Sequence, residues 1–463
     1  MSEILFSPKY KPFYDKGFKP IELELRSFHE NVRKSRKGQL LKIACERSDK
    51  EISVYEIDIF QDNSQYSYKN EYIVERLIKS LLWIRGGHKV YIGGSQSIFS
   101  RIKLLYSADG ARAFDAMIMS KIYEKPFEVE YIGLTEFPKE SEVSRSIGGH
   151  IKGYRIGFDV GGSDIKVSAV IDGTDIYSEE IVWNPKTEYD PEYHFNKMYE
   201  VMKKAAGKLP KVQAIGVSAA GIYINNRVMV ASLFKHLPDD VFDKHVKNIF
   251  LEIQREMGNI PLVVANDGDV GSLAGSMALE DSNVLGIAMG TSQAGGYVDE
   301  NCEIKGWLNE LAFVPTDLSD QAAFDDWSGD IGCGTSYFSQ DAVIRLANFA
   351  GINFDKRLTP AQKLQIVQKD LQKGCERAKH IFGDMGIYLG YTIPYYAEFF
   401  DIKHVLLLGR VMSGLGGNVI IDTARKVLRD EYPHLHQKIY LHLPDEKTRR
   451  VGQCIAAASL PQI

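Results

Sequence analysis

At 463 residues the chain is too long for one ordinary domain and fits two or three. Its hydrophobic content of 44% and charged content of 25% are ordinary for a globular protein, and the formal net charge of -5 leaves no electrostatic footprint for nucleic acid, so no nucleic-acid partner is expected. The five cysteines are scattered without a CxxC pair, which favours reduced thiols. No run approaches the roughly 20 apolar residues that cross a bilayer, and the first residues lack a signal-peptide pattern. We therefore expect a cytoplasmic protein with no membrane partner.

Residues 1–137 are predicted to form an α+β domain of unknown role. Alternating apolar residues predict two strands joined by a polar turn within 40–60, and apolar residues at helical spacing predict a helix over 71–84. The remaining elements are predicted, in order, as a strand at 89–92, helices at 96–106 and 111–123, and a strand at 127–132. The polar, glycine-containing stretch 138–153 is interpreted as a linker.

From Tyr154 onward the pattern changes. Strands and helices alternate to the end of the chain, which predicts an α/β architecture. A strand pair, a helix and another strand occur both in 40–92 and in 154–217. That echo is either an old duplication or a coincidence.

A glycine-rich turn follows the first buried strand of this part. The segment DVGGSDIK at 159–166 places an aspartate at the end of a strand, and Gly161 and Gly162 let the backbone turn tightly around an anion. Ser163 adds a hydroxyl donor. Because Asp159 and a phosphate are both negative, the aspartate would hold Mg²⁺ through water rather than bind the phosphate directly. A plain hairpin turn is the alternative interpretation.

Two further strand–turn units follow. GIAMGTSQAGGYV at 286–298 is typical of a second hairpin around phosphates, and VLLLGRVMSG at 405–414 is a strand that opens into a glycine loop before a helix predicted at 418–428. The sequence contains neither a Walker loop nor a Rossmann fingerprint. Three such units in this order indicate an ATPase that closes two lobes over a nucleotide.

Together these motifs resemble those of the ROK family (repressors, open reading frames and kinases) over residues 154–463. The resemblance is carried by six segments: FDVGGSDIKVSAV at 158–170, GVSAAG at 216–221, ANDGDVGSLAG at 265–275, GIAMGTSQAGGYV at 286–298, WLNELAFVP at 307–315 and VLLLGRVMSG at 405–414. It implies an α/β fold, the two-lobed actin-like (ribonuclease H-like) ATPase fold, preceded here by the additional N-terminal α+β domain. The first lobe would be 154–280 plus a C-terminal helix at 449–463, and the second lobe 281–448.

The resemblance implies transfer of the γ-phosphoryl group of ATP to a sugar hydroxyl, with Mg²⁺ held near Asp159. Asp267 matches the family's catalytic aspartate and would accept the hydroxyl proton. Further sugar contacts are implied for four residues: Asn266, Glu310, Gly221 and Asp325. ATP contacts are expected from ten residues: Asp159, Gly161, Gly162, Ser163, Lys166, Gly290, Thr291, Ser292, Gly409 and Gly414. Asn266 and Asp267 are also favoured helix starters, so a helix cap is the alternative interpretation of that pair.

Several residues depart from the family pattern. Phe313 stands where the family has a zinc-binding histidine, and the cysteine-rich zinc loop is missing, so no structural zinc site is expected. Asp325 or Asp326 would take the place of a sugar-binding glutamate. Ala220 replaces a proline, and the phosphate and adenosine loops have each lost a glycine, to serine and arginine respectively.

These departures leave alternatives to the ATP-dependent sugar kinase. The first is a catalytically degraded, ROK-like sugar sensor or pseudokinase. The second is a sugar-responsive transcriptional repressor, which the apparent lack of a helix-turn-helix pattern argues against. The basic run at 33–37 is interpreted as a solvated face. The family resemblance also implies a possible homodimer.

Overall fold

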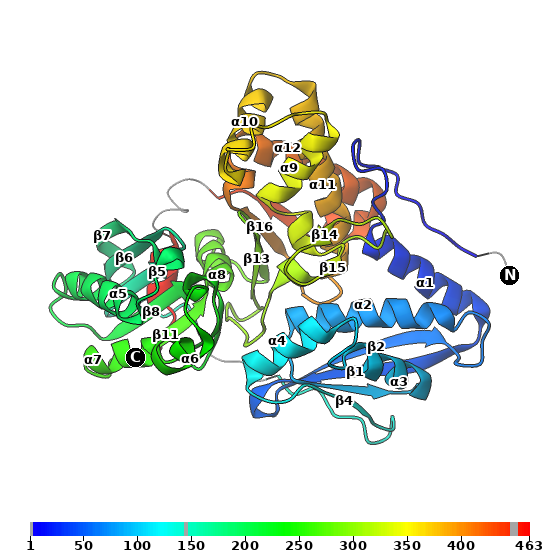
Figure 1. Cartoon of the computed structure of the whole chain (residues 1–463), viewed down its shortest axis with the longest axis horizontal. Coiled ribbons are helices and arrows are strands. Elements are labelled where there is room, and N and C mark those ends of the chain that lie inside the picture. The colour runs from blue at the N-terminus through cyan, green and yellow to red at the C-terminus, as the bar shows by residue number, and fades with distance from the viewer. Residues whose placement is uncertain (1–2, 143–146, 445–451) are drawn as a thin grey trace.

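The computed structural model describes residues 3–142, 147–444 and 452–463. The chain forms three bodies: an N-terminal domain, and two lobes that face each other across the start of one helix, α8 (Figure 1). Among the described residues, no helix combines the length and apolar character needed to span a membrane.

The N-terminal domain is a four-stranded sheet with helices against it. Its elements are α1 (Ile21–Ser35), β1 (Gly38–Glu46), β2 (Ile52–Phe60), α2 (Tyr68–Ile84), β3 (Lys89–Gly93), α3 (Gln96–Leu105), α4 (Ala113–Tyr123) and β4 (Glu128–Tyr131). The strand order is β2-β1-β3-β4, with β1 antiparallel to both neighbours and β4 parallel to β3. The elements predicted within 40–132 are all present, whereas helix α1 was not predicted.

The first lobe carries a five-stranded mixed sheet in the order β11-β8-β5-β6-β7. Its elements are β5 (Tyr154–Val160), β6 (Asp164–Ile171), β7 (Thr174–Val182), α5 (Pro191–Ala206), β8 (Ala214–Ala219), β9 (Ile222–Ile224), β10 (Arg227–Val230), α6 (Asp239–Val241), α7 (Ile249–Glu256), β11 (Leu262–Asn266), α8 (Asp267–Leu279) and α14 (Gln453–Ala458). Strands β5, β6 and β7 form an antiparallel meander, and β8 and β11 continue parallel to β5. Because β8 is parallel to β5 whereas β3 is antiparallel to β1, the echo between 40–92 and 154–217 is a coincidence of pattern.

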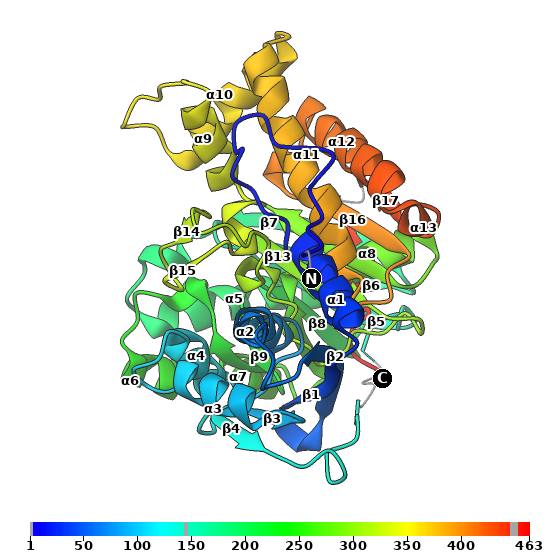
Figure 2. The same ribbon diagram turned by 90° about the vertical axis from the view of Figure 1, so that its right-hand side faces the viewer.

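The second lobe repeats part of this topology in the order β13-β12-β16-β17. Its elements are β12 (Val284–Met289), β13 (Gln293–Val298), β14 (Phe324–Asp325), β15 (Asp330–Ile331), α9 (Gln340–Phe349), α10 (Pro360–Gln372), α11 (Glu376–Tyr396), β16 (His404–Leu408), α12 (Leu415–Glu431), α13 (Pro433–His436) and β17 (Tyr440–His442). Beyond β13 the pairing continues only as an isolated bridge between Val298 and Ile304. Figure 2 shows α9 to α12 gathered at one end of the molecule, away from the N-terminal sheet.

The apolar cores join the N-terminal domain to the second lobe. One continuous cluster of buried side chains runs from Phe18 through α2 and the N-terminal sheet into β12, α11 and α12. The first lobe has a separate core of its own, and a small third cluster lies around α8 and α14. Residues 141–142, which precede the first lobe, are held against the N-terminal domain. Ser141 forms a β-bridge with Ile52, and Arg47 donates a hydrogen bond to the carboxylate of Glu142.

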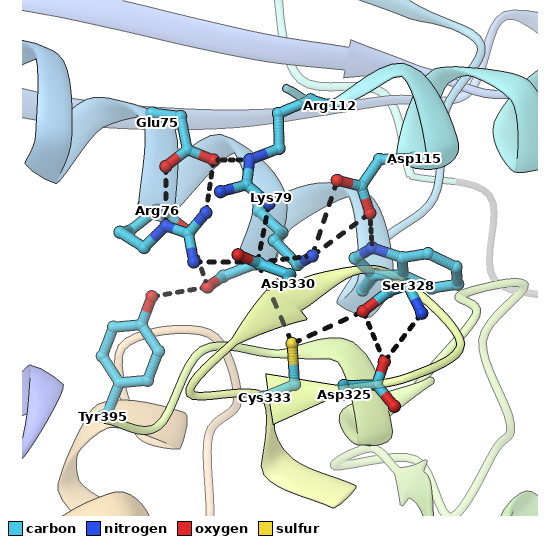
Figure 3. A network of polar contacts seen from close by, with 12 residues as sticks. Glu75, Arg76, Lys79, Arg112, Asp115, Asp325, Ser328, Asp330, Cys333 and Tyr395 are labelled. Atoms are coloured by element: carbon cyan, nitrogen blue, oxygen red, sulfur yellow. Dashed lines mark hydrogen bonds and ion pairs between the residues drawn. The ribbon is translucent and has the colours of Figure 1, made fainter. Parts of the chain in front are cut away.

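A buried ion cluster crosses the same junction (Figure 3). It consists of three acids and three bases: Glu75, Asp115, Asp330, Arg76, Lys79 and Arg112. One oxygen of Asp330, on β15 of the second lobe, is contacted at 2.7–2.9 Å by all three bases, which belong to the N-terminal domain. Burial works in the opposite direction, but these cations hold the pKa of Asp330 well below its usual range. The charges balance inside the cluster, so each buried ion has a partner.

Candidate functional site

The start of helix α8 lies against the second lobe at very short range. A Cβ atom on Gly296 of β13 would lie 2.2 Å from the carbonyl oxygen of Gly268, so only glycine allows this approach. Strand β11 leads directly into α8, and Asp267 is the first residue of the helix. The carboxylate of Asp267 is therefore presented where the two lobes meet.

Asn266 is the N-cap of α8. Its side-chain oxygen accepts a hydrogen bond from the backbone N–H of Gly268 at 2.7 Å, and its amide nitrogen donates to the carbonyl of Gly221 at 2.7 Å. The cap interpretation therefore holds for Asn266, while Asp267 remains available for chemistry. One amide hydrogen and one lone pair of Asn266 remain for a ligand.

Four acidic side chains form what we call the carboxyl cluster: Asp159, Asp267, Asp269 and Glu310. Burial raises the pKa of Asp267, and the N–H groups at the start of α8 partly oppose this. No side chain among the described residues donates a hydrogen bond to the Asp267 carboxylate. Burial and then the charges of Asp267 and Asp269 raise the pKa of Glu310 to about 8, and burial raises that of Asp269 to about 7. The cluster thus combines groups that hold protons with groups that can accept them.

Glu310 is positioned by the N-terminal domain. The backbone N–H of Glu310 donates to the carbonyl of Trp83 at 2.9 Å, and the N–H of Asn309 donates to the carbonyl of Ile84 at 3.0 Å. These carbonyls lie at the C-terminal end of α2, where a helix has unsatisfied acceptors. The side chain of Asn309 in turn donates to Asp269 at 2.8 Å. Helix α2 therefore supports two members of the carboxyl cluster.

The first predicted phosphate turn lies between β5 and β6, as expected. Burial raises the pKa of Asp159 to about 6, although a hydrogen bond from Ser218 at 2.8 Å and the charge of Lys166 favour its ionised form. Gly161 and Gly162 make the turn, and a Cβ atom on Gly162 would lie 3.1 Å from the ammonium of Lys186. Ser163 donates to the neighbouring carboxylate of Asp164 at 2.9 Å. The turn therefore combines backbone donors with nearby lysine charge, a setting that suits a phosphate.

Gln453 of α14 connects this turn to the catalytic candidate. Its amide donates to the hydroxyl of Ser218 at 3.0 Å and to the backbone carbonyl of Asp267 at 3.2 Å. The charge of Asp267 also acts on Asp159. The C-terminal helix thus holds the two halves of the predicted site together within the first lobe.

The second and third glycine turns lie side by side in the second lobe. They follow the parallel neighbours β12 and β16, and a Cβ atom on Gly409 would lie 2.3 Å from the carbonyl oxygen of Met289. Thr291 is exposed, and the hydroxyl of Ser292 is 2.9 Å from that of Thr335. Gly414, with a φ of 66°, precedes α12 without a side-chain cap, so the first N–H groups of that helix are available to a ligand.

Asp325 lies away from these groups. Its carboxylate accepts hydrogen bonds from the backbone and hydroxyl of Ser328, next to the buried ion cluster (Figure 3). Within the described part of the chain, no hydrogen bond or ion pair joins it to the carboxyl cluster. Phe313 packs on Trp83 with ring centroids 4.1 Å apart. Phe313, at the position where the family pattern has a zinc-binding histidine, therefore makes an aromatic contact with the N-terminal domain instead. No group of three His, Cys, Asp or Glu within the described ranges is arranged to hold a metal.

Sequence reasoning missed three residues of the site: Asp269, Ser218 and Gln453. Asp269 carried a usable signal, because an acidic residue follows Asp267 by two positions in an otherwise small and apolar helix. Ser218 stands within the GVSAAG segment at 216–221, but its contact with Asp159, like the contacts of Gln453, joins distant parts of the chain and had no local signal.

No protein-family model matches the chain, and no curated protein matches it either. Solved structures do match. A ROK family transcriptional regulator, described as a homolog of the E. coli MLC protein, superposes with a TM-score of 0.53 at 16% identity over 66% of this chain and 78% of that one. A ROK hexokinase from Thermus thermophilus gives 0.51 at 19% identity over 66% and 97%. A putative sugar kinase from Cytophaga hutchinsonii gives 0.50 at 13% identity over 65% and 98%.

The matched share of this chain, about two thirds, is what the resemblance of residues 154–463 led us to expect. Both lobes also carry sheets in which an antiparallel pair is extended by parallel strands, as expected for the actin-like ATPase fold. The two-lobed part of this protein has the fold of the ROK proteins.

Proposed function

We propose that the protein is an ATP-dependent kinase that phosphorylates a hydroxyl group of a sugar. One observation supports this above all: Asp267 is a half-buried carboxylate at a helix start where the two lobes meet, and no side chain among the described residues donates a hydrogen bond to it. Burial raises the pKa of Asp267 above its usual value, which makes the carboxylate a stronger base.

The roles of the residues follow from their positions. Asp267 would take the proton of the attacking hydroxyl, while Asn266 and Glu310 would orient the sugar by hydrogen bonds. A protonated Glu310, with a pKa of about 8, can donate a hydrogen bond to a sugar oxygen at neutral pH. The glycine turns at 161–163 and 290–292 would bind the phosphates, and the loop from Gly409 to Gly414 the adenosine.

A magnesium ion bound with ATP would neutralise charge on the phosphates. Asp159 fits such an ion, because it is a carboxylate at the phosphate turn whose charged form is supported by Ser218 and Lys166. A pKa of about 6 leaves it largely ionised at neutral pH. We therefore propose Asp159 as the residue that holds Mg²⁺ through water.

The test is ADP release in Mg·ATP with a panel of hexoses, N-acetylhexosamines and hexitols. We expect sugar-dependent turnover that falls by about 10²-fold or more in D267N, since positioned general bases contribute about 10²–10⁴-fold. D240N, at an exposed aspartate of the first lobe, is the matched control and should keep the wild-type rate. Turnover that survives D267N would contradict the assignment of the base.

The competing function is a sugar sensor that binds without turnover. It would be favoured by thermal stabilisation of the wild-type protein by a sugar together with no ADP release from any member of the panel. Serine and arginine in place of two loop glycines motivate this alternative.

A further inference from the structure

The first glycine turn has backbone donors that the protein leaves unused. Gly162 and Ser163 are exposed in the turn between β5 and β6. The N–H of Gly161 closes the turn on the carbonyl of Asp164 at 2.9 Å, but among the described residues no acceptor bonds the N–H of Gly162 or of Ser163. Two adjacent free N–H groups in a turn can bind an anion.

The segment that follows β7 is held against this turn. Trp183, which is 1% exposed, donates its backbone N–H to the carbonyl of Ser163 at 3.1 Å and its indole N–H to the carbonyl of Gly161 at 2.9 Å. Two residues later, a ring nitrogen of the buried His194 lies 3.1 Å from the carbonyl oxygen of Pro185. These contacts hold the backbone of the next residue, a lysine, beside the turn.

That residue, Lys186, covers the turn with its side chain. A Cβ atom on Gly162 would lie 3.1 Å from both the Cε and the Nζ of Lys186. The lysine is half-buried, and within the described part of the chain no carboxylate forms an ion pair with its ammonium. The ammonium is therefore available to an anion that the N–H groups of Gly162 and Ser163 bind, and a charged donor strengthens such a contact.

The other lysine near the turn is already engaged. Lys166 forms an ion pair with Asp164 at 3.3 Å, and the hydroxyl of Ser163 donates to the same carboxylate at 2.9 Å. The charge of Lys166 also favours the ionised form of Asp159. A phosphate that drew Lys166 away would leave two carboxylates without their cation, whereas Lys186 can bind a phosphate without breaking any ion pair of the described residues.

We propose that Lys186, rather than Lys166, is the cation that binds the phosphate chain of the nucleotide. The inference rests on the proposed function, because it takes the turn at 161–163 to be a site for the phosphates of ATP. Lys166 keeps its ion pair with Asp164 when the nucleotide binds.

The position of the turn indicates which phosphates Lys186 binds. Adenosine is expected at the loop from Gly409 to Gly414 of the second lobe, whereas Asp267, the proposed base, belongs to the first lobe. The phosphate chain therefore runs from the second lobe to the first, and its outer phosphates lie nearest the turn at 161–163. Lys186 should act on these outer phosphates and have little effect on AMP.

The experiment is calorimetric titration of AMP and of the imidodiphosphate analogue of ATP into the full chain, with Mg²⁺ and without sugar. K186Q should bind the analogue about tenfold more weakly than wild type, the loss expected for one hydrogen bond from a charged donor, while its affinity for AMP should change by less than about twofold. K186R keeps the charge and should recover most of the affinity, and K166Q should lose less affinity than K186Q. K203Q, at an exposed lysine of α5 in the same lobe, is the matched control and should bind both nucleotides like wild type.

Binding and turnover separate the failure of this inference from the failure of the proposed function. In a protein that releases ADP with a sugar, wild-type affinity of K186Q for the analogue would overturn the role of Lys186 and leave the kinase intact. An equal loss of affinity for AMP and the analogue, or a larger loss in K166Q than in K186Q, would overturn it as well. Weaker binding of the analogue by K186Q, together with no ADP release from wild type with any sugar, would support the role of Lys186 and overturn the kinase. A wild-type protein that binds neither nucleotide would overturn both.

Discussion

The N-terminal domain is attached to the two lobes in different ways. To the second lobe it is joined by a continuous apolar core and by the buried ion cluster around Asp330. To the first lobe it is joined by a smaller apolar contact, because Ile222 and Met229 belong to the same buried cluster, and by ion pairs at the surface: Glu124 contacts Arg227 at 2.6 Å and Lys247 at 2.7 Å, with 40% of its side chain exposed. Buried, mutually paired charges fix one geometry, whereas exposed pairs contribute little and are readily exchanged for water.

The N-terminal domain and the second lobe share the larger buried junction, so we expect these two parts to stay together when the lobes close. Closure of such lobes excludes water during phosphoryl transfer. The carboxyl cluster lies on the boundary between the lobes, since Asp159 and Asp267 belong to the first lobe and Glu310 to the second.

The largest effect is expected from breaking the buried junction. D330A removes the carboxylate that three buried cations share, and an uncompensated buried charge costs about 3–5 kcal/mol. The free energy of unfolding from urea titration should fall by that amount. D326A, at the exposed aspartate of the same hairpin, should leave it within about 0.5 kcal/mol of wild type. A loss from D330A as small as that from D326A would contradict the assigned role of the ion cluster.

A smaller, pH-dependent effect is expected at the boundary between the lobes. Because the pKa of Glu310 rises from an ordinary 4.5 to about 8, the folded protein keeps a proton that the unfolded chain releases between these values. The free energy of unfolding contributed by this group therefore falls as pH rises from about 4.5 to about 8. Glutamine cannot ionise, so E310Q should match wild type at pH 4.5 and exceed it by about 1–3 kcal/mol at pH 8.5.

A second glutamate-to-glutamine variant serves as the control for E310Q. E300Q, at an exposed glutamate of the second lobe, should follow the wild-type profile at both pH values. A stability difference between E310Q and wild type that stays constant with pH would show that the side chain does not change its protonation in this range.

The smallest effect is expected at the exposed junction. E124Q removes the charge that pairs with Arg227 and Lys247, and exposed pairs of this kind contribute about 0.2–1 kcal/mol. Thermal unfolding in low salt should show this small loss, and 1 M salt should remove it. E136Q, at an exposed glutamate outside the junction, is the control. A loss of stability in E124Q as large as that in D330A would contradict the conclusion that the two junctions differ in strength.

Much of the fold followed from the sequence. Period-two and period-3.6 patterns placed the N-terminal strands and helices, and the order of the glycine turns indicated two lobes. Helix α1 was missed because its buried residues begin at Ile21, Leu23 and Leu25, a spacing typical of a strand. That spacing arises because the helix packs on more than one side, against both the N-terminal sheet and α11.

The site was partly predictable for a similar reason. Asp267 and Asn266 stand within a motif, and the structure places them together with Asp159 and Glu310. The part played by α2 could not be foreseen. Its Arg76 and Lys79 look like the solvated face of an amphipathic helix, yet both are buried. Asp330, more than 200 positions away, pairs with both, while Glu75 and Asp115 each pair with one of them.

The buried ion cluster also sets an order of events during synthesis. Arg112, the last of its three bases, leaves the ribosome 218 residues before Asp330. At about 5–20 residues per second, the N-terminal domain waits about 10–45 s for the carboxylate that neutralises it. During that interval strands β5 to β11 of the first lobe emerge and can form its separate core, whereas α14 follows after Asp330. The N-terminal domain is therefore synthesised first, but its buried ion cluster is completed only after the first-lobe strands have been synthesised.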